Sequence, residues 1–170
     1  MSEVRIEDNL AIDASAPEVW HALEDPAAHA RWHPFVTQIT GEHRLGQVRT
    51  RSVVVGGKHG QTKERCVVEE PASRIGWTVQ EDATGFGRMV SNWCAGFSLT
   101  PRDGKTLVTA ESTFEPNNLL VRAMLPMIRR KFHQTHRAIL AALKESLETH
   151  RDGAGVRSED GSAFDTSSRT

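Results

Sequence analysis

Two side chains in this sequence are candidates for general acid/base chemistry, His136 and Glu64. His136 stands one helical turn beyond Phe132, at the edge of the apolar arc of a predicted helix, so its imidazole is expected to project into the interior. Glu64 alternates with Thr62 and Cys66 on one face of a predicted strand. If that face points inward, burial raises the pKa of the Glu64 carboxyl and suits it to proton transfer. Two other interpretations stay open: a histidine that bonds the sheet backbone or is half-exposed, and a glutamate exposed at the sheet edge.

Eight histidines are many for 170 residues, so metal sites need consideration. His29 and His33 are four positions apart, but a proline follows and no carboxylate completes a set of three. His133 and His136 are three apart on a predicted helix, among arginines whose charges repel a cation. Because a zinc site needs at least three protein ligands, neither pair predicts one. We expect no metal.

Motifs for nucleophilic catalysis and for nucleotide binding are missing. The chain has no GxSxG and no GxGxxG, so neither a nucleophile elbow nor a dinucleotide fingerprint is predicted, and we expect no cofactor. The two cysteines, Cys66 and Cys94, form no CxxC pair. They are expected to be free, half-buried thiols, which fits a reducing cytoplasmic location.

The elements that position these side chains begin with a strand and two short helices. Apolar residues alternate with polar ones from Val4 to Ile12, which predicts a strand. Ser15 and Glu18 have the spacing of a capping box and start a helix that ends at Asp25-Pro26. A second short helix is expected from Pro26 to Arg31, ahead of Trp32-His33-Pro34.

Strand patterns separated by glycine-containing turns fill the middle of the chain. We expect strands near residues 36–43, 47–55, 61–70, 74–81, 88–100 and 105–115. The connections are too short for a crossover helix, so the sheet is predicted to be antiparallel and meandering.

A long helix is predicted near the C-terminus, from about Asn118 to Thr149. Its apolar residues fall within one arc of roughly 100°, and Pro126 is expected to kink it about one turn in. Residues 151–170 are rich in glycine, serine and charge, which is typical of a disordered tail. Residues 1–150 are therefore expected to form a single domain.

Several motifs in this order resemble the START-like superfamily, and within it the polyketide cyclase/dehydrase and lipid-transport proteins. They are Ile12-Asp13-Ala14-Ser15-Ala16-Pro17-Glu18-Val19-Trp20, Trp32-His33-Pro34, Ile75-Gly76-Trp77, Phe97-Ser98-Leu99-Thr100-Pro101 and Thr113-Phe114-Glu115-Pro116. The resemblance covers residues 3 to 148. It implies an α+β helix-grip fold, in which an antiparallel sheet of about seven strands curls around the long helix. It also implies a deep apolar cavity between the two, with its mouth near His33.

The residues themselves also favour a cavity. A sheet of this size curls, and a curled sheet against a single helix leaves volume for large side chains or a ligand. In the predicted strand 88–100, Ser91 and Ala95 are small neighbours of Trp93, which suits a pocket but also suits ordinary interlocked packing. The residues expected to line the cavity are Trp32, His33, Trp77, Met89, Trp93, Phe97, Met124, Ile128 and Phe132.

Composition narrows the function further. Lys plus Arg total 21 against 22 Asp plus Glu, a net charge of −1, so the chain lacks the basic field of a nucleic-acid binder. No apolar run reaches the roughly 20 residues that span a bilayer, and the N-terminus lacks the pattern of a signal peptide. Three hypotheses remain: a monomeric or weakly dimeric carrier of a small apolar or aromatic molecule, a polyketide cyclase/aromatase that uses His136 and Glu64, and a co-chaperone-like interaction module.

Overall fold

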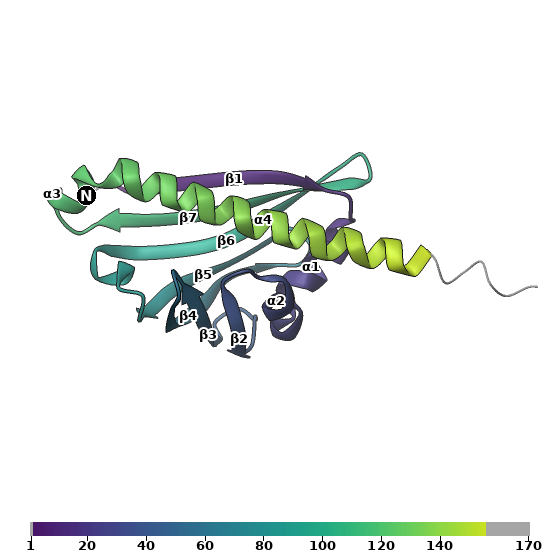
Figure 1. The fold of residues 1–170 in the computed structure, drawn as a ribbon, viewed down its shortest axis with the longest axis horizontal. Helices are drawn as coiled ribbons and strands as arrows, with labels where there is room; N and C mark the ends of the chain where they lie inside the picture. Colours follow the sequence, from purple (N-terminus) through teal and green to yellow (C-terminus); the bar gives the residue numbers. More distant parts are fainter. Residues whose placement is uncertain (1, 156–170) are drawn as a thin grey trace, which may run out of the picture.

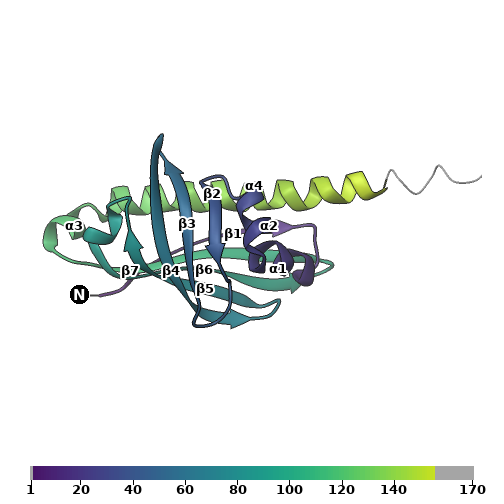
Figure 2. The ribbon, with the colours of Figure 1, turned by 90° about the horizontal axis from the view of Figure 1, so that it is seen from below.

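The computed structural model describes residues 2–155, and it confirms the predicted helix-grip architecture. Seven antiparallel strands form one sheet in the order β1-β7-β6-β5-β4-β3-β2. Their bounds are β1 Val4–Ile12, β2 Val36–Gly41, β3 Val48–Val55, β4 Lys58–Glu70, β5 Arg74–Asp82, β6 Val90–Arg102 and β7 Lys105–Pro116. The sheet curls so that β2, β3 and β4 rise toward the long helix, which lies along β1 and β7 (Figures 1 and 2).

Two short helices close one end of the curled sheet, as expected. Helix α1, Ala16–Glu24, begins with the predicted capping box between Ser15 and Glu18. Helix α2, Pro26–Trp32, is capped by the Asp25 carboxylate, which accepts a hydrogen bond from the Ala27 amide. Their apolar faces pack into the core beneath the C-terminal part of the long helix (Figure 2).

The C-terminal helix differs from the expected single kinked element. It is divided at Met124 into α3, Leu119–Ala123, and α4, Leu125–Gly155. Pro126 lies in the first turn of α4, where its missing N–H costs nothing, so the chain breaks the helix instead of bending it. Helix α4 also continues past the expected end at residue 149. Of the expected disordered tail, residues 156–170 lie outside the described residues.

Strand β6 contains a bulge, so the predicted alternation of inward and outward side chains is wrong at the start of this strand. The pairing with β7 shifts between Ser91 and Cys94, and Asn92 has a φ of 52°. The extra residue places both Val90 and Trp93 on the inner face, while Ser91 is exposed. Met89 is not part of the strand, because it ends a short 3-10 helix, η1 (Phe86–Arg88).

A glycine is required where β5 and β6 approach most closely. A Cβ added at Gly96 would lie 2.6 Å from the Ile75 carbonyl oxygen, well inside van der Waals contact. Gly76 is its direct cross-strand partner. The pair lets the two strands come together at the centre of the curled sheet.

Candidate functional site

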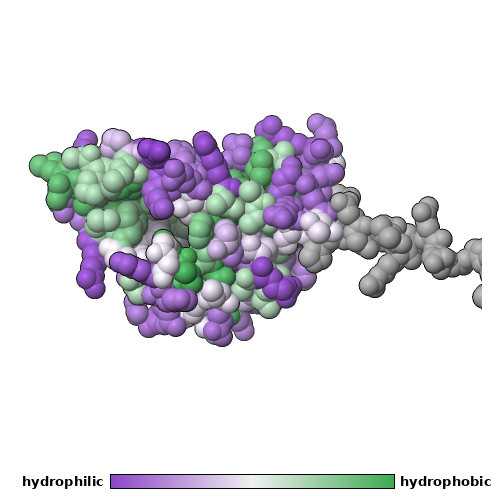
Figure 3. All heavy atoms as spheres, viewed as in Figure 1, coloured by the Kyte–Doolittle hydropathy of each residue, from purple (hydrophilic) through white to green (hydrophobic). Residues whose placement is uncertain are grey.

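A cavity of about 340 Å³ lies between the concave face of the sheet and α4. This volume is within the range of small-molecule sites. Its apolar walls are formed by Phe35, Val53, Val55, Trp77, Phe86, Trp93, Ala95, Phe97, Ala110, Phe132 and Ile139. The space-filling view shows the surface hollowed on this side, with apolar residues beside the opening (Figure 3).

An aromatic cluster of Phe86, Trp93, Phe114 and Phe132 lies at the start of α4, and all of its members except Phe114 line the cavity. Phe86 lies at the centre, with ring centroids 5.0 Å from Trp93, 5.3 Å from Phe114 and 5.2 Å from Phe132. Most of these contacts are edge-on or tilted, the arrangement that aromatic pairs prefer. These contacts hold the rings in place, so this side of the cavity is an apolar wall.

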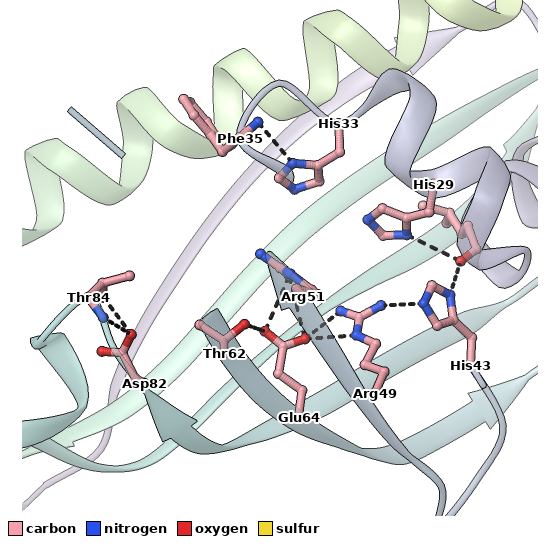
Figure 4. A network of polar contacts seen from close by, with 11 residues as sticks. His29, His33, Phe35, His43, Arg49, Arg51, Thr62, Glu64, Asp82 and Thr84 are labelled. Atoms are coloured by element: carbon pink, nitrogen blue, oxygen red, sulfur yellow. Dashed lines mark hydrogen bonds and ion pairs between the residues drawn. The ribbon is translucent and has the colours of Figure 1, made fainter. Parts of the chain in front are cut away.

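The opposite wall carries an ionic network of His43, Arg49, Arg51 and Glu64 (Figure 4). Glu64 and Arg49 are direct partners in the β3–β4 ladder, so both side chains point to the concave face. Glu64 Oε2 accepts hydrogen bonds from Arg49 Nη2 at 2.6 Å and Nε at 2.8 Å, and Glu64 Oε1 lies 3.3 Å from Arg51 Nη1. The Arg49 and Glu64 side chains are only 1% and 5% exposed.

The Glu64 side chain points to the interior and is not exposed at the sheet edge. The expected rise of its pKa, however, is wrong. Burial raises the pKa of the carboxyl, while the charges of Arg49 and Arg51 and hydrogen bonds from Arg49 and Thr62 lower it. The net pKa lies below the ordinary value. Glu64 is therefore an ionised, fully engaged carboxylate, a poor base for proton transfer.

Arg49 is held from three sides. Beyond Glu64, its Nη1 donates to His43 Nε2 at 2.9 Å, and its guanidinium carbon lies 3.5 Å from the centre of the Trp77 ring. His43 Nδ1 donates to the Leu23 carbonyl at 2.8 Å, which leaves Nε2 free to accept. Burial and the nearby Arg49 charge lower the pKa of His43 to about 4, so the ring is neutral at physiological pH.

Two further histidines, His29 and His33, lie between the ionic network and α2 (Figure 4). Their rings stack with centroids 5.3 Å apart. His29 Nδ1 donates to the Leu23 carbonyl, and His33 Nδ1 accepts from the Phe35 amide at 3.2 Å. Burial first, and the arginine charges second, hold the pKa of both well below the ordinary histidine value. Neutral imidazoles therefore form this part of the wall.

His136 lines the cavity from α4, which is one of the placements that its position at the edge of the helical arc allowed. Its side chain is buried and its Nε2 lies 2.9 Å from Ser112 Oγ on β7. On the other side of the ring, Nδ1 lies 3.3 Å from Asp8 Oδ2 on β1. Burial lowers the pKa of His136, and Asp8 opposes this in part, so the net pKa stays below the ordinary value.

Five buried side-chain nitrogens have no hydrogen-bond partner among the described residues, and all belong to residues that line the cavity. They are His29 Nε2, Arg51 Nε, Trp77 Nε1, Trp93 Nε1 and His136 Nδ1. The last is near Asp8 but is not aligned with it as a donor. Buried polar atoms nearly always have hydrogen-bond partners in native proteins. The unpaired nitrogens are therefore unusual, and they are concentrated in the residues that line the cavity.

Comparison with known proteins identifies the family and the fold. Residues 3–148 match the family described as polyketide cyclase/dehydrase and lipid transport. The chain belongs to this family. A search of curated protein sequences finds no match.

Solved structures share the fold of this family member at low sequence identity. The Zhui aromatase/cyclase from Streptomyces sp. R1128 superposes with a TM-score of 0.70 at 20% identity, over 95% of this chain and 100% of that one. A START superfamily protein from Mycobacterium smegmatis gives 0.70 at 16%, over 86% and 98%. A norcoclaurine synthase from Thalictrum flavum gives 0.68 at 15%, over 88% and 97%.

Seven of the site residues predicted from the sequence line the cavity. They are His33, Glu64, Trp77, Trp93, Phe97, Phe132 and His136. The other four lie outside its wall. Trp32 is packed in the core and donates from Nε1 to the Ala22 carbonyl. Met89, Met124 and Ile128 belong to the apolar cluster around the start of α4.

Sequence reasoning missed the two arginines, although a signal was present. Arg49 and Arg51 alternate with Val53 on the same face of β3, and Val53 is buried. The tight Gly56-Gly57 turn fixes the register of the hairpin, which places Arg49 opposite Glu64. Reading the two strands as a pair would have found the ion pair.

No group of three or more metal-ligating side chains occurs among the described residues. His29 and His33 stack on each other, and His133 and His136 share the Asp8 carboxylate. Within residues 2–155, no helix has the length and apolarity to cross a membrane.

Proposed function

We propose that the protein binds a small, largely apolar molecule with one to three rings in this cavity, and that the molecule carries an oxygen that accepts hydrogen bonds. The supporting observation is the set of unpartnered donors on the wall. Arg51 Nε, Trp77 Nε1 and Trp93 Nε1 can only donate, and all three are buried beside apolar surface. A carbonyl, phenol or carboxylate oxygen is the complement that satisfies them.

The charge of the ionic network favours an anionic or strongly polar oxygen over a cation. Arg49 and Arg51 carry two positive charges against the single carboxylate of Glu64, and burial lowers the pKa of Arg49 only to about 10, so it stays charged. The histidines beside them are neutral at physiological pH. Arg51 therefore faces the cavity with positive charge that Glu64 only partly compensates.

Tryptophan fluorescence tests this proposal with a matched pair of probes, 2-naphthoate and naphthalene. Apolar burial of a two-ring molecule, less the cost of immobilising it, gives dissociation constants of roughly micromolar order. Arg51→Gln is expected to weaken naphthoate binding by roughly tenfold or more and to leave naphthalene nearly unchanged, because only naphthoate loses a charge-assisted hydrogen bond. Arg130→Gln, on the exposed face of α4, is the control.

Quenching by neither probe up to its solubility would reject the proposal and favour an interaction module instead. Equal weakening of both probes by Arg51→Gln would show that Arg51 supports the wall without contacting the ligand. That result would overturn the assignment of Arg51 as the group that binds the oxygen of the ligand.

A second candidate is an acid/base enzyme that acts on a carbonyl substrate, of the cyclase/dehydrase type. Its support is His33, whose Nδ1 accepts from the Phe35 amide, so that Nε2 carries the ring proton close to Arg51. The two groups are suited to polarise a carbonyl, with the neutral His136 as base. His136→Asn should then abolish turnover of a poly-carbonyl substrate while naphthoate still binds. Unchanged turnover would exclude this role.

A further inference from the structure

Three residues that are far apart in the sequence meet at the α4 side of the cavity. Ser112 comes from β7, His136 from α4 and Asp8 from β1. Ser112 and His136 are only 3% and 4% exposed, yet both line the cavity. The hydroxyl and the imidazole are therefore shielded from bulk solvent and open to whatever the cavity holds.

The carboxylate of Asp8 decides which nitrogen of His136 carries the proton. A bare lone pair on Nδ1 would face the Asp8 Oδ2 charge at 3.3 Å, which is repulsive, whereas an Nδ1–H is attracted to it. With the proton on Nδ1, Nε2 is an acceptor. The 2.9 Å contact is then a hydrogen bond that Ser112 Oγ–H donates to His136 Nε2.

We propose that Ser112 is a nucleophile for acyl transfer from small apolar esters, with His136 as its base and Asp8 as a positioning residue. Ser112 Oγ bonds to the ester carbonyl carbon while its proton passes to Nε2. The tetrahedral adduct expels the alcohol oxygen, which takes the proton from Nε2, and an acyl-Ser112 ester remains. Water then attacks this ester by the same route and releases the carboxylic acid and free Ser112.

Trp93 supplies a donor for the oxygen that becomes negative in this step. It lies two residues before Ala95, the direct cross-strand partner of Ser112, and it lines the same cavity. Its Nε1–H is buried and has no partner among the described residues. A free N–H on the neighbouring strand is the kind of group that stabilises an oxyanion.

The titratable groups around His136 leave it able to accept a proton at neutral pH. Asp8 faces it from β1, and His133 and Arg137 on α4 also contact Asp8, with His133 Nδ1 at 2.7 Å from Oδ2 and Arg137 Nε at 3.3 Å from Oδ1. Burial lowers the pKa of His136 more than Asp8 raises it. Acylation should therefore persist through neutral pH and fail on acidification through that lowered pKa, where Nε2 is already protonated.

Labelling with a fluorophosphonate probe tests the nucleophile directly, through a phosphorus–oxygen bond that forms on Ser112 as fluoride leaves. We expect one added mass, mapped by peptide mass spectrometry to Ser112, and slow hydrolysis of 2-naphthyl acetate. Ser112→Ala should abolish both, His136→Asn should slow both by roughly 10²–10⁴-fold, and Ser98→Ala on the other face of β6 should change neither. Label on another residue, or full labelling of Ser112→Ala, would overturn the proposal.

Asp8→Asn separates positioning from structural support. Because Asp8 raises the pKa of His136, its loss should slow hydrolysis and move the acid limb of the pH profile downward. A lower rate with an unmoved limb would assign Asp8 a structural role only. The inference rests on the proposed function in that the cavity must admit the ester, so naphthoate quenching is measured on every variant. If naphthoate quenches the wild-type protein but the probe does not label it, the nucleophile alone is rejected. If naphthoate does not quench the wild-type protein, the binding proposal is rejected.

Discussion

The cavity has two polar regions, and they differ in how their buried polar groups are compensated. In the ionic network, Glu64 is paired with Arg49 and Arg51, and His43 completes the contacts of Arg49. At the α4 side, Ser112 and His136 form a neutral pair, with the charge of Asp8 held behind the imidazole. A charge inside a protein is tolerated only when it is compensated, whereas a neutral pair retains the freedom to exchange a proton.

The two regions thus separate groups that have a structural role from groups that are available for chemistry. Glu64 is engaged by three neighbours, and its lowered pKa keeps it ionised, so it stabilises the wall. The unpartnered nitrogens of Arg51, Trp77 and Trp93 belong to residues that line the cavity.

The largest effect is expected for Glu64→Ala. Removal of one partner leaves Arg49 charged and buried, which costs about 3–5 kcal/mol of unfolding free energy. Glu81→Ala, which removes the exposed Lys63–Glu81 pair beside the same strand, should cost less than about 1 kcal/mol. Urea denaturation of both variants gives the comparison, and equal losses would show that the ionic network is not structural.

Phe132→Ala should cost roughly 3 kcal/mol, at the low end for a buried aromatic, because one side of the ring borders the cavity. Its other side packs against Phe86 and Phe114. Met127→Ala, an exposed position on the same helix, should change stability by less than about 0.5 kcal/mol. A negligible cost for Phe132→Ala would mean that the aromatic cluster does not hold α4 to the sheet.

Stability is also expected to depend on pH. Folded His43 stays neutral down to about pH 4, whereas in the unfolded chain it takes up a proton below its ordinary value of 6.5. The unfolded state therefore binds more protons between these limits, and the unfolding free energy falls as pH drops from 6.5 to 4. The slope from this residue is at most about 1.4 kcal/mol per pH unit.

His43→Gln should flatten that slope, and His21→Gln, on the exposed side of α1, should not. Denaturant titrations at several pH values measure both. A slope unchanged by His43→Gln would place its titration in the folded state near that of the unfolded chain.

The fold was predictable because its signals are local. The capping box at Ser15, the glycine turns and the period of two in the strands each depend on neighbouring residues, and together they determine the helix-grip order. The errors also have local causes. The bulge at Asn92 inverts the alternation only at the start of β6, before Trp93, and Pro126 starts a new helix where a kink was expected.

The site was only half predictable, because its chemistry depends on pairs. Trp77, Trp93, Phe132 and His136 were found from single-element periodicity, which gives the face but not the neighbours. The direction of the Glu64 pKa depends on Arg49 across a hairpin, and the role of Ser112 depends on a helix 24 positions later in the chain. Such contacts follow from strand register and helix docking, which a single-element pattern does not contain.

The most direct test of the binding proposal uses the four tryptophan side chains as internal probes. Trp20 and Trp32 donate from Nε1 to Glu24 and to the Ala22 carbonyl, whereas the indole N–H groups of Trp77 and Trp93 are unpartnered at the cavity. In a ¹H–¹⁵N correlation spectrum titrated with 2-naphthoate, we predict that the Trp77 and Trp93 indole signals shift and saturate together while the Trp20 signal stays in place. A saturating shift of Trp20, with Trp77 and Trp93 unmoved, would contradict the account.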